Sequence, residues 1–243
     1  MEATVAPTIG EMVAENYRTA PVFKKYGIDF CCKGGRTIED ACAAKGIDPL
    51  PLMADLEAAI TEKDADAVDY TTWKLDRLAN HIEDVHHTYV TTAIEQLKPF
   101  LDKVAKVHGD GHPYLIDIRN MFFESAGNLT QHMKKEELIL FPFIKKMQLA
   151  KDAGDAMPQP SFGTVENPIA MMRMEHEDEG ERFEAMSILS DGFNPPEYAC
   201  NTWRVTYSLL KEFQDDLFQH IHLENNILFP KALEMEAGIG TAS

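Results

Sequence analysis

The chain has few cysteines, and their spacing excludes a disulfide framework. Cys31 and Cys32 are adjacent, whereas Cys42 and Cys200 each stand alone in 243 residues. Small domains that depend on disulfides carry regularly spaced sets of cysteines in a short chain. We therefore interpret all four side chains as thiols in a reducing compartment.

Positive charge is also scarce. Lysine and arginine number 23 against 40 aspartates and glutamates, which gives a formal net charge of −17. Because phosphate groups are bound by clustered Lys and Arg, this balance argues against nucleic acid, and equally against an anionic membrane surface, as a partner. No long apolar run is present, and the start MEATVAPTIGEM lacks the basic and apolar regions of a signal peptide. We expect a cytoplasmic protein.

Strand signals are nearly absent, and long helical patterns take their place. The breaks between these patterns are HGDGHP, KDAGDAMPQPSFG and DGFNPP, all rich in Gly, Pro and Asp. Four long helices with short or moderate connections favour an all-α protein built as an antiparallel four-helix bundle. The predicted helices span residues 73–107, 113–149, 166–190 and 196–236.

Residues 1–65 predict a small separate unit of four short helices. The first, TIGEMVAEN, begins with a capping box made by Thr8 and Glu11. The second, APVFKKYG, is followed by the loop IDFCCKGGRT and by two further helices, TIEDACAAKG and PLMADLEAAITEK. The polar stretch 62–72 is the predicted linker to the bundle at 73–236, and 237–243 is a tail.

One eleven-residue pattern occurs twice in the chain. HMKKEELILFP begins at His132 and HIHLENNILFP begins at His220, and both read H-x-x-x-E-x-x-I-L-F-P. Residues four apart are neighbours on one helix face, so each histidine pairs with Glu136 or Glu224. Both pairs continue the apolar stripe of their helix and therefore point at the core. Buried glutamates and imidazoles need partners there.

The other two helices add inward histidines. His176, in MEHEDEGE, shares a face with Met172 and Phe183. In NHIEDVHH, the apolar residues upstream favour the face of His86, whereas those downstream run in phase with His87. Periodicity thus leaves the contribution of this helix open between two adjacent residues.

Four imidazoles and two carboxylates suit a pair of iron ions, with the glutamates bridging and oxygen or hydroxide completing the set. Zinc is the alternative metal, although structural zinc sites usually are closed and rich in cysteine. The spacing also differs from the Glu-x-x-His pattern of ferritin-like bundles. A single inward histidine is usually a hydrogen-bonded core residue, but the duplicated motif weighs against that explanation here.

These motifs resemble two known domains. H-x-x-x-E-x-x-I-L-F-P on two helices, with EHED between them, resembles the haemerythrin-like di-iron domain. KKYGIDFCCKGGRT resembles the small cysteine-bearing domain that precedes it in the iron–sulfur cluster repair family, also called Repair of Iron Centers. The resemblance extends from about Ile9 to about Leu233 and implies a haemerythrin-like bundle after the small helical unit.

The resemblance also implies the ligands. In that family the histidine of the first helix follows an earlier one by six residues, which selects His87, six after His81. His81, His86 and His222 then lie behind the ligands or at the surface. His108 is 21 residues beyond His87, roughly 31 Å along an unbroken helix, and is left out. Two iron ions, oxo- or hydroxo-bridged, would be bound by His87, His132, Glu136, His176, His220 and Glu224.

One departure from oxygen-carrying haemerythrins concerns the third helix. They place a second histidine four residues after the first, whereas Gly180 stands at that distance from His176. The missing ligand would leave an iron open, or let water or Glu179 fill the position. An open position favours reaction or iron exchange over reversible oxygen storage.

Cys31 and Cys32 are the candidate catalytic thiols. The basic residues Lys33 and Arg36 would lower a thiol pKa and make it more nucleophilic. The alternative is that both cysteines are small buried hydrophobic residues. The resemblance favours a thiol site that transfers iron, takes part in nitric oxide chemistry or contacts a damaged client protein.

The resemblance implies a function in repairing iron–sulfur clusters damaged by nitrosative or oxidative stress. The protein would donate iron, reduce nitric oxide at the di-iron centre, or both, and its partners would be damaged or apo iron–sulfur proteins. Nitric oxide or oxygen would be its small ligand. The alternatives are a non-catalytic oxygen or nitric oxide binding or sensing module and a bundle in which the repeat serves packing. Monomer and homodimer both stay open.

Overall fold

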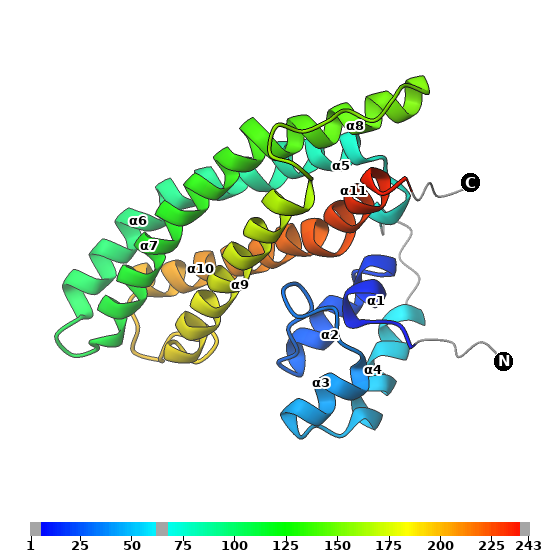
Figure 1. Cartoon of the computed structure of the whole chain (residues 1–243). Coiled ribbons are helices and arrows are strands. Elements are labelled where there is room, and N and C mark those ends of the chain that lie inside the picture. The colour runs from blue at the N-terminus through cyan, green and yellow to red at the C-terminus, as the bar shows by residue number, and fades with distance from the viewer. Residues whose placement is uncertain (1–5, 62–67, 239–243) are drawn as a thin grey trace.

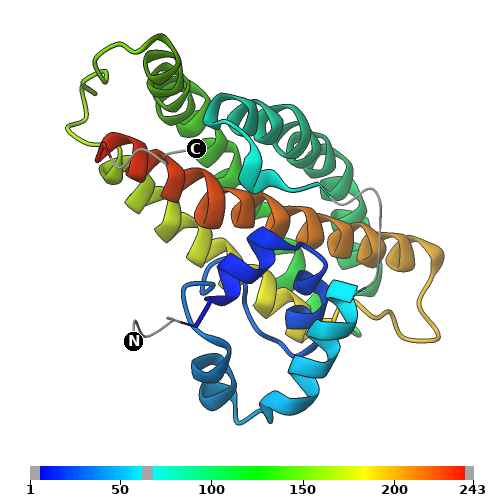
Figure 2. The same ribbon diagram turned by 90° about the vertical axis from the view of Figure 1, so that its right-hand side faces the viewer.

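The computed structural model describes residues 6–61 and 68–238, and it begins with a small helical unit. This N-terminal unit lies beside the bundle, against its last helices (Figures 1 and 2). The predicted capping box is present: Thr8 Oγ1 accepts from the Glu11 N–H at 3.2 Å, and the Glu11 carboxylate accepts from the Thr8 N–H at 2.8 Å. The helices of the unit are α1 (Ile9–Glu15), α2 (Thr19–Lys25), α3 (Ile38–Lys45) and α4 (Pro49–Thr61).

Part of the predicted linker, 62–67, and part of the tail, 239–243, lie outside the described residues. The rest of the linker includes the 3₁₀ turn η1 (Tyr70–Thr72). Within the part of the chain that the structure describes, no helix combines the length and the apolar character that crossing a bilayer requires.

Four long helical segments form the bundle, and the all-α expectation is confirmed (Figure 1). The first and second segments are joined by a short turn, and the third runs uninterrupted as α9 (Glu166–Leu189). The first consists of α5 (Leu75–His81), η2 (Ile82–His87) and α6 (Thr88–His108). The second consists of α7 (Tyr114–Lys135), η3 (Glu136–Leu140) and α8 (Phe141–Ala153). The fourth consists of α10 (Asn201–Leu223), η4 (Glu224–Leu228) and α11 (Phe229–Glu236).

The segments η2, η3 and η4 are π-helical turns within otherwise continuous helices. A π turn carries an extra residue, so it shifts the phase of the helix on one side relative to the other. The buried residue Ile82, at the start of η2, is in phase with His86, and downstream of η2 the buried residue Val90 is in phase with His87. The ambiguity in the sequence pattern thus had a physical cause, because both histidines are buried.

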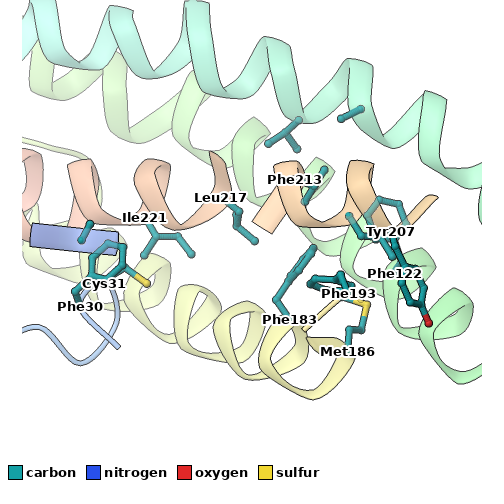
Figure 3. Close-up of a cluster of buried hydrophobic side chains, with 14 of the residues drawn as sticks. Phe30, Cys31, Phe122, Phe183, Met186, Phe193, Tyr207, Phe213, Leu217 and Ile221 are labelled. Carbon is teal, nitrogen blue, oxygen red and sulfur yellow. The ribbon is translucent and has the colours of Figure 1, made fainter. Parts of the chain in front are cut away.

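Two hydrophobic clusters fill the bundle. One contains residues of α6, α7, α10 and the end of α9 together with the N-terminal unit. In this cluster Phe183 stacks on Phe213, with ring centroids 5.3 Å apart (Figure 3). The other contains α5, α8, α11 and the start of α9. Each of the four helical segments contributes residues to both clusters, and the predicted metal ligands lie where the two clusters meet.

The N-terminal unit is packed into the first cluster. Phe30 and Cys31 lie beside Ile221 of α10 in Figure 3. His222 is 1% exposed, with its ring 5.8 Å from that of Tyr17 and 6.0 Å from that of Phe30. Of the two positions expected for His222, behind the ligands or at the surface, burial excludes the surface. The N-terminal unit covers this face of α10, and burial lowers the pKa of His222 to about 3.

Candidate metal centre

All six side chains predicted as ligands meet between the two hydrophobic clusters. None of them is more than 3% exposed. They form two groups in which one ligand atom from each residue lies within 4.8 Å of the others. Glu136 and Glu224 belong to both groups, as bridging carboxylates would. The first group is His87, Glu136, His220 and Glu224, and the second is His132, Glu136, His176 and Glu224.

Hydrogen bonds orient three of the four imidazoles. Nδ1 of His87 is 2.8 Å from the Glu137 carboxylate, and Nδ1 of His132 is 2.8 Å from Glu175. Nδ1 of His176 is 3.0 Å from Oδ1 of Asn225. The partner atoms are oxygens that accept, so Nδ1 carries a proton and it is Nε2 that faces the centre. Metal-binding histidines are typically held in this way.

His220 is oriented differently. Its Nε2 is 3.0 Å from Oε1 of Glu224, four residues away, and its Nδ1 has no hydrogen-bond partner among the described residues. Its ring stacks on that of His86 with centroids 5.6 Å apart. His86 in turn bonds through Nδ1 to the Asp216 carboxylate at 2.9 Å, so His86 lies behind the ligands as the resemblance implied.

The polar atoms at the centre fit metal ions. Within the described chain, His87 Nε2 and both carboxylate oxygens of Glu136 are buried without a hydrogen-bond partner, and so is Glu224 Oε2. Nε2 of His132 and Nε2 of His176 face each other at 3.1 Å. The imidazoles are the ionic partners of the two carboxylates there, and a buried carboxylate is stable only when its charge is compensated. Cations between the nitrogens and oxygens would supply that compensation in place of imidazole protons.

The electrostatics keep both glutamates ionised. Burial and the charge of Glu224 raise the pKa of Glu136, but His132 and His87 outweigh them and the pKa is lowered. Burial likewise opposes ionisation of Glu224, yet His220 and His176 hold its pKa well below the usual range. Burial lowers the pKa of His132, whereas the attraction of Glu136 and hydrogen bonds to carboxylates raise it to about 10. Cations that bind here replace protons.

Two other candidates do not join the centre. The buried carboxylate of Glu179 accepts from Ser125 Oγ and from Asn128 Nδ2 at 3.1 Å, so it does not fill the position left by the missing histidine. His108 lies at the far end of α6, with Nε2 3.2 Å from Cys200 Sγ. The helix runs through Pro99 without the break that His108 would need to reach the ligands.

The double-cysteine loop contacts the centre at His176. Cys32 Sγ donates to the backbone carbonyl of His176 at 3.3 Å, and Asn225 Nδ2 donates to the carbonyl of Cys31 at 3.2 Å. Asn225 therefore joins the imidazole of His176 to the loop. A Cβ at Gly180 would lie 3.1 Å from Cys32 Sγ, so the absence of a larger side chain there leaves room for the thiol.

The expected lowering of the thiol pKa by basic neighbours is wrong for Cys31. Lys33 Nζ instead lies 3.8 Å from Glu177 and 3.6 Å from Glu181 of α9. The hydrogen bond with Cys32 and burial raise the pKa of Cys31 well above its ordinary value, and the charge of Asp29 adds to the effect. Cys31 is buried as a neutral thiol.

Comparisons with known proteins cover nearly the whole chain. Residues 6–60 match the ScdA_N family, described as a domain of unknown function (DUF542), and residues 78–232 match the "Hemerythrin HHE cation binding domain". The iron–sulfur cluster repair protein YtfE of Musicola paradisiaca is 35% identical over 233 residues, which are 95% of this chain and 97% of the relative. YtfE of Pectobacterium carotovorum is 35% identical over 232 residues, with 94% and 97% covered. YtfE of Yersinia pseudotuberculosis is 34% identical over 229 residues, with the same coverage. The chain belongs to the YtfE family of iron–sulfur cluster repair proteins, with a haemerythrin-like bundle behind a small helical N-terminal domain.

Proposed function

We propose that this protein binds two iron ions and repairs iron–sulfur clusters damaged by nitrosative or oxidative stress. The observation that carries the proposal is the pair of ligand groups that share Glu136 and Glu224. His87 and His220 would bind one ion, and His132 and His176 the other. The names of the relatives supply the repair function, and the bundle supplies the chemistry that suits it.

Each part of the centre has a defined task in this proposal. The hydrogen bonds to Nδ1 keep the imidazoles directed toward the centre. The two hydrophobic clusters exclude water on the two sides of the centre along the bundle. The carboxylates of Glu136 and Glu224 can shift between bridging and terminal binding as the charge on the metals changes. Bound iron would supply one-electron chemistry and an exchangeable coordination position.

A cavity of about 240 Å³ reaches the ligands from one side. His132 and His176 line it, together with the carboxylates of Glu175, Asp178 and Glu179 and with Lys135, which pairs with Glu175. A path to one of the two iron positions in which acidic groups outnumber the basic one favours the release or exchange of a cation. Iron donation to an apo iron–sulfur protein is therefore the activity we favour, with nitric oxide reduction as the second activity of the same centre.

The test begins with the metal content of the protein purified without oxygen. We expect about two iron ions per chain, the capacity that two octahedral or near-octahedral N/O sites provide. The double variant Glu136→Gln/Glu224→Gln should lose most of this iron, whereas Glu95→Gln, at an exposed position of α6, should retain it. A protein without iron, or a double variant with full iron content, would contradict the proposal.

Two activity assays then separate the functions. Transfer of iron from the loaded protein to an apo iron–sulfur protein tests donation. Repeated consumption of nitric oxide under reducing conditions tests catalysis, and its absence together with stoichiometric binding would support the alternative, a module that binds or senses oxygen or nitric oxide. Neither activity should survive in the double variant.

A further inference from the structure

The loop between α2 and α3 brings three potential metal donors together outside the bundle. Asp29, Cys31 and Cys32 each offer a ligand atom within 4.8 Å of the other two. The two sulfur atoms are 3.8 Å apart, and Cys31 Sγ is 3.4 Å from Asp29 Oδ1. A tetrahedral ion with metal–sulfur bonds of about 2.3 Å and a metal–oxygen bond of about 2.0 Å has edges of about 3.8 and about 3.5 Å. The two edges that meet at Cys31 already have this spacing, and the third, between Cys32 and Asp29, is within 4.8 Å.

The loop is held in this shape without a metal. Asp29 Oδ1 accepts from the backbone N–H groups of Cys31 at 3.0 Å and of Cys32 at 2.9 Å. From the bundle, Asn225 and Asn226 donate to the carbonyls of Cys31 and Phe30, both at 3.2 Å. An ion would thus meet donors that are already close together. Its binding would displace the two thiol protons, including the one that Cys32 donates to the His176 carbonyl.

Two clefts adjoin the donors. Cys31 lies in the wall of a cleft of about 280 Å³ between the N-terminal unit and α9. Cys31 and Cys32 together line a neighbouring cleft with Arg173, Met174 and Glu177. A fourth coordination position would face these clefts and accept a ligand from an incoming protein or from solvent.

We propose that Asp29, Cys31 and Cys32 form a further metal site, separate from the six ligands of the bundle, for a divalent thiophilic ion. Two thiolates and one carboxylate oxygen suit Zn²⁺ or Fe²⁺. Binding exchanges the two thiol protons for the ion, and no electron is transferred. The assignment of Fe²⁺ as the natural cargo rests on the proposed function, whereas the site itself does not.

The Asp29, Cys31 and Cys32 site is connected to one side of the metal centre. Cys32 contacts the backbone of His176, and Asn225 joins the Cys31 carbonyl to the His176 imidazole. The site is therefore next to one iron position, that of His132 and His176, and not the other. The thiolate site would thus lie close to this iron position, outside the cavity lined by Glu175, Asp178 and Glu179.

The experiment titrates the metal-free full-length protein with Cd²⁺ and records the ultraviolet charge-transfer band that cadmium–thiolate bonds produce. We expect the band to saturate at one Cd²⁺ per chain and to disappear in Cys31→Ser and in Cys32→Ser. Cys42→Ser, which removes a buried thiol of α3, should leave it unchanged. Asp29→Asn keeps an oxygen acceptor for both N–H groups but loses the charge, so its Cd²⁺ affinity should fall by about tenfold or more.

The Glu136→Gln/Glu224→Gln variant separates this proposal from the previous one, because it should lose iron yet keep the cadmium band. Absence of the band in the wild-type protein, or a full band in both serine variants, would overturn the thiolate site. A double variant that keeps its iron would instead overturn the di-iron proposal alone. Circular dichroism checks folding, and Cys32→Ser, at a half-buried position, serves as the test if Cys31→Ser does not fold.

Discussion

Two of the hydrogen-bond acceptors that orient the histidines lie in the repeated motif itself. Glu137 follows Glu136 and accepts from His87, whereas Asn225 follows Glu224 and accepts from His176. The same position of the motif thus orients a histidine of a neighbouring helix in both halves of the bundle. A carboxylate increases the basicity of its imidazole more than an amide does, so His87 and His176 would differ in basicity as ligands.

Asn225→Asp should uncouple the loop from the centre. The oxygen that accepts from His176 remains, but the N–H donor to Cys31 is replaced by a second oxygen facing a carbonyl. Loss of about 1 kcal/mol of hydrogen bonding should raise the alkylation rate of Cys31 and Cys32 about fivefold, with iron content unchanged. Asn120→Asp, on the exposed face of α7, is the control. Equal alkylation rates in both variants would show that Asn225 does not hold the loop.

Gly180→Ala should disturb the contact with Cys32, and Gly127→Ala provides a matched comparison. Alanine is favoured over glycine in a helix by about 1 kcal/mol. A Cβ at Gly127 meets open space, so urea unfolding should show this gain, whereas a Cβ at Gly180 lies 3.1 Å from Cys32 Sγ. We expect a smaller gain for Gly180→Ala together with faster alkylation of Cys32. Identical behaviour of the two variants would contradict the close contact.

At the scale of elements, the π turns decide which residues face inward. They contain or adjoin the metal ligands in three of the four bundle segments, with His87 in η2, Glu136 in η3 and Glu224 in η4. The sequence carried one trace of them, the change of phase between His86 and His87. The helix spans themselves follow from apolar periodicity and from the Gly- and Pro-rich breaks, and they agree with the structure to within a few residues.

A substitution of Phe213 tests the aromatic packing in the cluster that the bundle shares with the N-terminal unit. Its ring contacts those of Phe122 and Phe183, each at 5.3 Å between centroids, and none of the three is exposed (Figure 3). Phe213→Ala should lower the free energy of unfolding by about 3–5 kcal/mol, as measured by urea unfolding. Val107→Ala, at a residue 63% exposed, should change it by about 0.5 kcal/mol or less. If Phe213→Ala lowered the free energy of unfolding no more than Val107→Ala does, this packing would not have a central role in stability.

At the scale of the whole molecule, the metal centre and the N-terminal unit share one core. The cluster formed by α6, α7, α10 and the end of α9, which packs against the predicted ligands, also contains Phe23, Phe30 and Cys31 of the N-terminal unit. Removal of the proposed metals would leave Glu136 and Glu224 with the histidines as their ionic partners, next to this shared core.

Iron removal should lower the thermal stability of the protein. An ion present at about 1,000 times its dissociation constant contributes about 4 kcal/mol to a folded state that alone binds it. The metal-free protein should melt at a lower temperature than the loaded protein, and adding Fe²⁺ without oxygen should restore the melting temperature. Glu136→Gln/Glu224→Gln should show no such response. A melting temperature independent of iron in the wild-type protein would exclude metal binding in the core.

The sequence alone was sufficient for the helix spans and for the two inward His/Glu pairs, because these depend on spacings of three and four residues within one helix. Tertiary structure decided the rest. It directs Glu179 to Ser125 and Asn128, covers His222 with the N-terminal unit, and pairs Lys33 with glutamates of α9. The contact of Asn225 with Cys31 joins residues 194 positions apart. Local periodicity determines which face a side chain occupies. It does not specify which distant residue will occupy the opposite face, since that depends on how separate helices dock.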